Sequence, residues 1–131
     1  PAGTRTALEA ATAVGCEVGA IVKSLVFVAD GRAVLVLTSG ANRVDEHRLA
    51  AALGADSVRK ADAEEVREAT GYAIGGTPPF GHDTPVPVLI DPALLGHPIV
   101  WAAAGTPSTV FPLTPDELVR ASGARTADVA S

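Results

Sequence analysis

The chain has 131 residues, of which 47% are hydrophobic and 19% charged, and its formal net charge is −5. This length and composition predict a single globular domain over residues 1–131. No apolar run approaches the roughly 20 residues that a helix needs to cross a bilayer, so we expect no membrane partner. The acidic balance argues against a large nucleic-acid footprint, because such binding depends mainly on Lys and Arg contacts to phosphates. We therefore expect no DNA partner.

The single cysteine, Cys16, excludes an internal disulfide and fits a reducing cytoplasm, where we expect the protein to work. No histidine or second cysteine lies near it in the sequence. A core or half-buried thiol is therefore expected rather than a reactive one.

The first elements are a helix and a hairpin. Thr6 and Glu9 have the spacing of a capping box, which predicts a helix over residues 7–14, followed by a tight connection or short helical turn over 16–20. Residues 21–29 and 33–38 are apolar and rich in β-branched side chains, and Asp-Gly joins them, so they predict an antiparallel hairpin covered on both faces.

The remaining patterns alternate between helices and short strands. Pro85 and Pro87 suggest that the strand over 86–91 is an edge strand or begins there. Helices are expected over 45–53, 62–70 and 114–123, and strands over 57–59, 86–91, 99–103, 109–113 and 126–129. These elements predict an α+β fold: a mixed, mostly antiparallel sheet of six or seven strands, curled or closed into a pseudo-barrel, with about four flanking helices.

Lys23 is the unusual residue of the first strand. Period-two alternation puts its ammonium on the same face as Ile21, Leu25 and Phe27. A half-buried lysine needs an anionic partner or a route to solvent. Two interpretations are open: a strand-end lysine that reaches water, or a cation that binds phosphate or carboxylate in a cavity.

Residues 71–82 must form a shaped loop, because four glycines and two adjacent prolines suit neither a helix nor a central strand. Gly75 and Gly76 leave backbone amides uncovered, and the prolines stiffen the segment, which suits a rigid pocket wall. His82 is either a surface turn residue or a general base.

The familiar catalytic signatures are absent: no nucleophile elbow, no zinc-binding His pair, no Cys pair and no phosphate-binding glycine loop. The three histidines, His47, His82 and His97, are far apart, and we expect no metal and no cofactor. His47 lies among charged residues and is expected on a solvated helix face. A reaction here must therefore use backbone amides, Lys23, hydroxyl groups and the substrate itself.

Several of these segments together resemble the YbaK/EbsC family, which is related to the editing domain inserted in bacterial prolyl-tRNA synthetases. The resemblance covers about residues 6–129. It rests on Val-Lys-Ser-Leu-Val-Phe at 22–27, the Gly-Pro loop at 71–81, Val-Leu-Ile-Asp at 88–91, and Ala104-Gly105.

The resemblance implies an aminoacyl-tRNA deacylase that acts in trans on mischarged tRNA, typically tRNA for proline carrying alanine or cysteine. The expected partners are the tRNA acceptor end and prolyl-tRNA synthetase. Lys23, Gly75 and Gly76 are implied as catalytic: the lysine would contact terminal phosphate or ribose, and the amides would stabilise the oxyanion. The resemblance implies that Thr77, Pro78, Pro79 and Gly105 line the substrate pocket, and His82 and Ser108 are further candidates for substrate binding.

Ser108 departs from the family pattern, since members that remove alanine are expected to carry histidine near this position. Hydroxyls of Thr77 and Ser108 serve equally well to stabilise a loop or to contact substrate. Two rival functions fit the same sequence: a non-catalytic module that binds a nucleotide or aminoacyl-nucleotide, and an interaction module that recruits a synthetase.

Overall fold

The computed structural model describes residues 2–72, 79, 86–103 and 110–131, and the account below is confined to them. The helices are α1 (Ala2–Val14), α2 (Glu46–Leu53), α3 (Ala63–Thr70) and α4 (Pro115–Ser122), with 3₁₀ turns η1 (Val18–Ala20) and η2 (Pro92–Gly96). The strands are β1 (Ile21–Ala29), β2 (Arg32–Ser39), β3 (Val58–Lys60), β4 (Val88–Ile90), β5 (Val100–Ala103), β6 (Val110–Leu113) and β7 (Arg125–Thr126).

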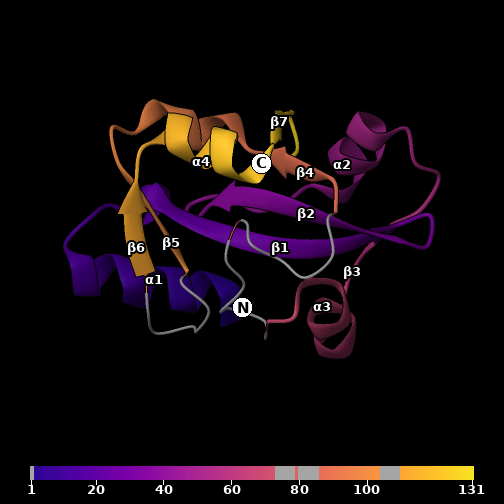
Figure 1. The fold of residues 1–131 in the computed structure, drawn as a ribbon, viewed down its shortest axis with the longest axis horizontal. Coiled ribbons are helices and arrows are strands. Elements are labelled where there is room, and N and C mark those ends of the chain that lie inside the picture. The colour runs from indigo at the N-terminus through magenta and orange to yellow at the C-terminus, as the bar shows by residue number, and fades with distance from the viewer. Residues whose placement is uncertain (1, 73–78, 80–85, 104–109) are drawn as a thin grey trace.

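The seven strands form one open mixed sheet in the order β6-β5-β1-β2-β4-β7, and β3 pairs with the end of β1 that is remote from β5 (Figure 1). The longest ladders, β1 with β2 and β5 with β6, are antiparallel, whereas β1–β5, β2–β4 and β4–β7 are parallel. The predicted α+β class, with a mixed, mostly antiparallel sheet and four flanking helices, is confirmed. The sheet ends at β6 and β7 and is not closed.

The β1–β2 hairpin is the centre of the sheet. Its register runs from Val22 opposite Ser39 to Ala29 opposite Arg32, as the apolar runs predict. Asp30 and Gly31 both have positive φ, 48° and 81°, which is the backbone that a two-residue hairpin turn requires. The Asp30 carboxylate also accepts hydrogen bonds from the backbone of Asp56 and Ser57, so the turn is tied to the start of β3.

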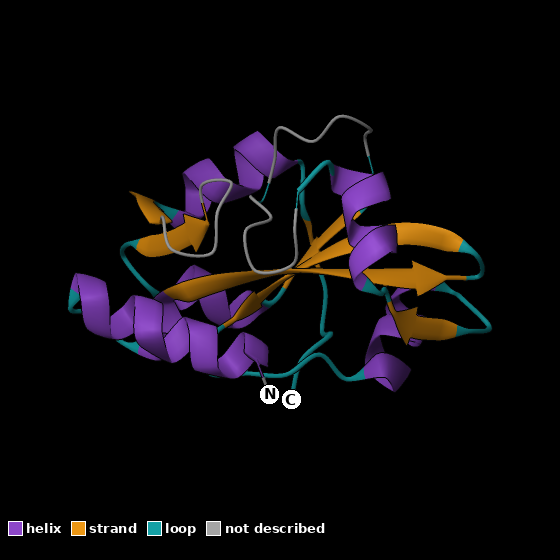
Figure 2. Cartoon of the chain, turned by 90° about the horizontal axis from the view of Figure 1, so that it is seen from below, coloured by secondary structure: helices purple, strands orange, loops and turns teal. Residues whose placement is uncertain are grey.

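Helices cover both faces of this hairpin, as Figures 1 and 2 show. On one face, α3, η2 and α4 contribute Val66, Leu94 and Leu118 to a core with Val22, Val26, Leu35 and Leu37. The other face is covered in two places. Leu49 of α2 packs with Phe27, Val34, Val36, Leu89 and Val129, and Ala7 and Ala11 of α1 pack with Ile21. The predicted burial of both faces is therefore confirmed.

Three helices begin and end as their sequences predict. Asp62 and Thr114 cap α3 and α4 through complete capping boxes, and Asp45 caps α2. All three helices end at a glycine in the left-handed conformation, including Gly71 after α3 and Gly123 after α4. The helix α3 therefore leads directly into the glycine-rich segment that starts at residue 71.

One local prediction is wrong, and for a second the structure selects one of the two alternatives. Thr6 lies inside α1, which starts at Ala2, so it cannot be the N-cap of that helix. The strand β4 is also not an edge strand, because it lies between β2 and β7. Pro87 stands just before β4, where its carbonyl accepts a hydrogen bond from Leu35 and its missing N–H costs nothing, so the alternative of a strand start is the correct one.

Among the described residues, no helix is long and apolar enough to cross a membrane. The last strand is also shifted from its expected place at 126–129: β7 is Arg125–Thr126, and Ala130 instead forms an isolated bridge with Val44. The chain end is thereby joined to the segment that precedes α2.

We expect Leu37→Ala to lower the free energy of unfolding by about 2–5 kcal/mol, because Leu37 is 0% exposed in the central hairpin and its truncation leaves a cavity. Leu8→Ala on α1 is the matched control, since Leu8 is 52% exposed and should change stability by less than about 0.5 kcal/mol. Urea unfolding of both variants measures the difference. Equal losses would show that the hairpin is not the main core.

The Glu65 carboxylate predicts an acid-sensitive stability term. Its hydrogen bonds from Arg59 and from the backbone of Asp62 lower its pKa to about 2. A lowered folded-state pKa adds stability that is complete above the ordinary value near 4.5 and is lost as the pH falls toward 2. Glu65→Gln should therefore flatten the fall of the thermal midpoint between pH 5 and pH 2.

Glu64→Gln is the control for this effect, because Glu64 is the neighbouring exposed carboxylate of α3 and makes no hydrogen bond or ion pair within the described part of the chain. An unchanged acid profile in Glu65→Gln, or the same flattening in Glu64→Gln, would contradict the assignment.

Candidate functional site

Lys23 is the third residue of β1 and lies on the face that the alternation predicts. Its neighbours on that face, Leu25 and Phe27, pack in the α2 core, and Ile21 packs under α1. Lys23 thus stands between the two apolar clusters, and it is half-buried. A cation at such a position must find hydrogen-bond acceptors close by.

Lys23 belongs to a polar row that crosses three strands. It lies opposite Thr38 in the β1–β2 ladder, and Leu37 lies beside Ile90 in the β2–β4 ladder. One residue further along, Asp91 therefore stands next to Thr38 on the same face. We call Lys23, Thr38 and Asp91, together with Asn42 in the loop after β2, the polar row.

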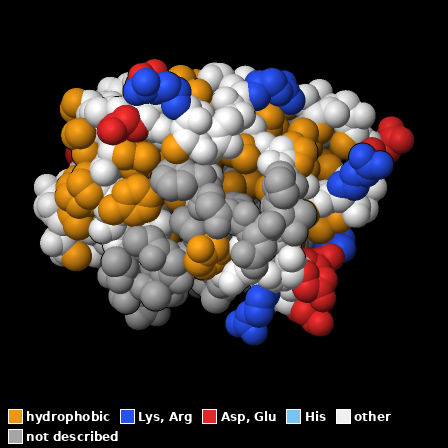
Figure 3. Space-filling view, viewed as in Figure 1, with side chains coloured by type: hydrophobic (Ala, Val, Ile, Leu, Met, Phe, Trp, Pro, Cys, Tyr) orange, Lys and Arg blue, Asp and Glu red, His pale blue; other side chains and the backbone are white. Residues whose placement is uncertain are grey.

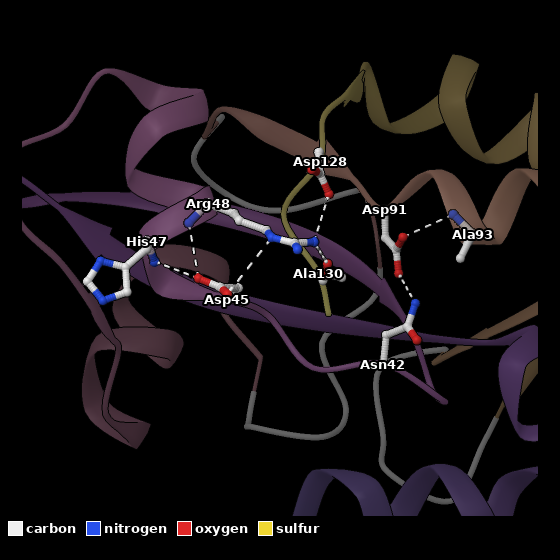
Figure 4. Close-up of polar contacts among 8 residues, drawn as sticks. All are labelled: Asn42, Asp45, His47, Arg48, Asp91, Ala93, Asp128 and Ala130. Carbon is white, nitrogen blue, oxygen red and sulfur yellow. Dashed lines mark hydrogen bonds and ion pairs between the residues drawn. The ribbon is translucent and has the colours of Figure 1, made fainter.

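The Asp91 carboxylate is the anchor of the polar row (Figure 4). It is only 3% exposed, and it accepts hydrogen bonds from the side-chain amide of Asn42 at 2.9 Å, from the backbone N–H of Ser39 at 3.2 Å and from that of Ala93 at 3.0 Å. One buried carboxylate thus joins the end of β2, the following loop and the first turn of η2. Such charge-assisted bonds compensate the burial of its charge.

Asn42 connects this anchor to the lysine. Its side chain donates to Asp91, and its backbone carbonyl accepts a 2.6 Å hydrogen bond from Nζ of Lys23. Lys23 therefore has a neutral oxygen as its direct partner. The carboxylate of Asp91 is linked to it only through Asn42. An ammonium has three donors, and this bond is the one that the described residues show for it.

The electrostatic surroundings lower the pKa of Lys23. Burial is the largest cause, and the positive charges of Arg43 and Lys60 act in the same direction, whereas Asp91 raises the pKa. The cation is thus held with an incomplete balance of charge. A group in this state gains from an anionic ligand that supplies the missing charge.

The loop that carries Asn42 is closely packed. The Ser39 hydroxyl donates to the carbonyl of Gly19 at 2.8 Å, and the N–H of Gly40 donates to the carbonyl of Ile21 at 2.7 Å. A Cβ on Gly40 would collide with the backbone carbonyl oxygen of Val18. The absence of a side chain at Gly40 is therefore required for the loop to approach η1.

Two hydroxyl groups near Lys23 are buried without a hydrogen-bond partner in the described structure. They belong to Thr38, which is part of the polar row, and to Ser24, which lies on the opposite face of the sheet. Buried hydroxyls without partners are uncommon in proteins. Near Lys23, these two buried hydroxyls therefore lack hydrogen-bond partners among the described residues.

Most of the other predicted site residues lie outside the described residues. These are Gly75, Gly76, Thr77, Pro78, His82, Gly105 and Ser108. Pro79 is described and is buried, so the loop residue expected to stiffen a pocket wall is in contact with the protein. Whether Lys23 and the glycine amides share one cavity stays a prediction.

Two expectations about side chains outside the site agree with the structure. His47 is exposed on α2 with Arg48, whose guanidinium pairs with Asp45 and Asp128 (Figure 4). Cys16 is half-buried against α1, and burial raises the pKa of its thiol. Among the described residues, no cluster of three or more His, Cys, Asp or Glu side chains could hold a metal ion.

The polar row contains residues that the sequence alone did not single out. The sequence places Asp91 at the end of a strand and in the family motif at 88–91, and it assigns no site role to Asp91, Asn42 or Thr38. A signal was present, because an Asp-Pro pair directly after a buried apolar strand and a lysine inside another strand both need polar partners. Only the strand order brings them together.

One face of the molecule shows how the described cations are distributed. On the face shown in Figure 3, the Lys and Arg side chains of the described residues stand apart from one another and do not form one continuous basic patch. Hydrophobic side chains lie between them.

The family model of the aminoacyl-tRNA editing domain matches residues 1–121. A solved crystal structure of a candidate trans-editing enzyme for prolyl-tRNA synthetase is 56% identical, with a TM-score of 0.92, and covers 100% of this chain and 83% of its own. The uncharacterized protein YwhH of Bacillus subtilis is 32% identical over 114 residues, which are 86% of this chain and 72% of that protein.

A proline–tRNA ligase of Lactobacillus gasseri is 41% identical over 76 residues, which are 58% of this chain. The matched part is 14% of that ligase, so this chain corresponds to a small portion of the much longer enzyme. The fold and these similarities define the class of protein: this chain belongs to the aminoacyl-tRNA editing domain family. The resemblance to the editing domains associated with prolyl-tRNA synthetase is confirmed.

We expect Gly40→Ala to lower the free energy of unfolding by about 1–3 kcal/mol, because the new methyl group forces the loop away from η1. Gly96→Ala in η2 is the control, since a Cβ there meets nothing within 4 Å and should change stability by less than about 0.5 kcal/mol. Thermal or urea unfolding compares the two. Equal stability of both variants would mean that the loop is free to shift.

Proposed function

We propose that this protein is an aminoacyl-tRNA deacylase that acts in trans, with tRNA for proline carrying alanine or cysteine as its substrate. The family match over residues 1–121 carries the proposal. The 56% identity to a candidate trans-editing enzyme and the partial match to proline–tRNA ligases support the link to proline. We place its work in the cytoplasm, where tRNAs are charged.

The chemistry needs no side-chain nucleophile. Water adds to the ester carbonyl carbon, the bond from that carbon to the ribose oxygen breaks, and free amino acid and tRNA with a restored hydroxyl are released. An aminoacyl ester is already activated toward hydrolysis, and the neighbouring ribose hydroxyl assists the attack of water. Backbone amides of Gly75 and Gly76 are proposed to stabilise the oxyanion, an effect worth roughly 3 kcal/mol per donor in other hydrolases.

Lys23 is proposed to bind the terminal phosphate or ribose of the tRNA. Its ammonium is held on a rigid central strand and uses one of its three donors on Asn42. Burial and two neighbouring cations favour an anionic ligand at this point. A phosphate oxygen supplies the negative charge that the direct partner, a neutral carbonyl, does not.

The net charge of −5 is compatible with a substrate that is gripped only at its acceptor end. The rest of the tRNA is then free to be held by another protein. We propose prolyl-tRNA synthetase as this partner.

A panel of mischarged tRNAs tests the activity. We expect release of free alanine or cysteine from tRNA for proline, with or without added prolyl-tRNA synthetase, and no release of proline from correctly charged tRNA. The measurement is the loss of labelled aminoacyl-tRNA against an enzyme-free control. Saturable binding without hydrolysis of any charged tRNA would instead show a binding module.

Lys23→Ala should lower kcat/KM by at least about tenfold through loss of a charge-assisted contact to substrate. The variant should remain folded, because a lowered lysine pKa means that the folded state disfavours this charge. Arg32→Ala removes an exposed cation from the far end of the same hairpin and should keep wild-type activity. Wild-type turnover in Lys23→Ala would refute the role.

A further inference from the structure

The buried carboxylate of Asp91 accepts more hydrogen bonds than the capping of η2 requires. Its bond to the N–H of Ala93 caps η2, and this is the role that an Asp-Pro turn predicts. The other oxygen accepts from Ser39 and from the side chain of Asn42, neither of which belongs to η2. This second oxygen therefore acts on the loop after β2.

We propose that Asp91 is a positioning residue for Lys23: through the side chain of Asn42 it fixes the loop carbonyl that receives the ammonium, and its carboxylate supplies the balancing charge. The chain of contacts is continuous, from Asp91 Oδ2 to Asn42 Nδ2 at 2.9 Å and from the Asn42 carbonyl to Lys23 Nζ at 2.6 Å. Asp91 does not touch substrate in this proposal.

Different groups orient Lys23 and balance its charge: the Asn42 carbonyl contacts the ammonium, and the Asp91 carboxylate supplies the negative charge. A direct Lys–Asp pair would satisfy the ammonium and compete with a phosphate ligand. The Asn42 link instead leaves a neutral oxygen in contact with Lys23 while the carboxylate stays close enough to favour its protonated form. The lysine is thus kept oriented, charged and available to an anion.

Among the described residues, three charged groups act on Lys23. Arg43 follows Asn42 in the same loop, Lys60 comes from β3, and Asp91 ends β4. The neutral neighbours on this face are Thr38, which lies opposite Lys23 in the β1–β2 ladder, and the residues that pack around Ile21, namely Trp101, Ala7 and Ala11. Within the described structure Asp91 is therefore the negative charge that opposes burial and the two cations.

The first test is the titration of Lys23, which needs no tRNA. The chain contains two lysines, Lys23 and Lys60, so selective ¹³C labelling of lysine gives two resolvable signals that Lys60→Arg assigns. We expect Asp91→Asn to lower the pKa of Lys23, because it removes the charge that raises this pKa. Asn42→Ala, which keeps Asp91, should leave the pKa of Lys23 nearly unchanged.

The second test is the pH profile of deacylation, and this part rests on the proposed function. If protonated Lys23 binds substrate, kcat/KM falls as the pH rises through its pKa, after subtraction of uncatalysed ester hydrolysis. A lower pKa in Asp91→Asn therefore moves this alkaline limb to lower pH. Asn42→Ala should reduce kcat/KM on the order of tenfold without moving the limb, since only orientation is lost.

Asp30→Asn is the matched control. Asp30 also accepts backbone hydrogen bonds, from Asp56 and Ser57, but it lies at the hairpin turn at the opposite end of β1. It should leave both the Lys23 titration and the pH profile unchanged. A merely structural role of Asp91 would lower the thermal midpoint in the same way as Asp30→Asn and move neither.

The outcomes distinguish the inference from the function. An unchanged pKa of Lys23 in Asp91→Asn overturns the charge role, and wild-type kcat/KM in Asn42→Ala overturns the positioning role. If no charged tRNA is hydrolysed, the proposed function fails while the titration still decides the coupling between Asp91 and Lys23. Should Asp91→Asn not fold, Asn42→Ala and the wild-type titration carry the test, with wild-type kcat/KM in Asn42→Ala counting against positioning.

Discussion

The main constraint on this structure is that Lys23 places a half-buried ammonium on the central strand β1. β1 pairs with β2, β3 and β5 and has apolar clusters on both faces, so a charge on it loses much of its hydration. Lys23 is accommodated because β4 lies on the far side of β2 and brings Asp91 into the same row. The strand order, the loop at Asn42 and the capping of η2 by Asp91 all contribute to the surroundings that accommodate the charge of Lys23.

This compensation matters for the proposed deacylase function, because that proposal assigns substrate binding to Lys23 and uses no side-chain nucleophile. A lysine paired directly with a carboxylate is a structural ion pair, whereas a lysine held by a carbonyl keeps part of its charge and its donors for a ligand. Editing also requires that a substrate end be placed accurately, since positioning alone supplies a large share of such rate enhancements. A rigid strand is a better support for that task than a loop.

Much of the fold was predictable from local patterns. The hairpin turn, the caps of α2, α3 and α4 and their glycine ends follow from residues within one turn of each other. The errors arose where the decisive partner is distant or absent from the pattern. Thr6 has the spacing of a cap, but the helix continues through it to Ala2. For β4 the prolines left an edge strand and a strand start open, and only the pairing with β7 excludes the edge.

The sequence by itself determined that Lys23 would lie half-buried on a strand with two apolar faces, because alternation along a strand is a local property. It also determined the glycine and proline content of the segment at 71–82. Only the tertiary structure decided what surrounds the lysine, because Asn42 and Asp91 are 19 and 68 residues further along the chain. The approach of Asp91 depends on the parallel pairing of β2 with β4, which no local pattern encodes.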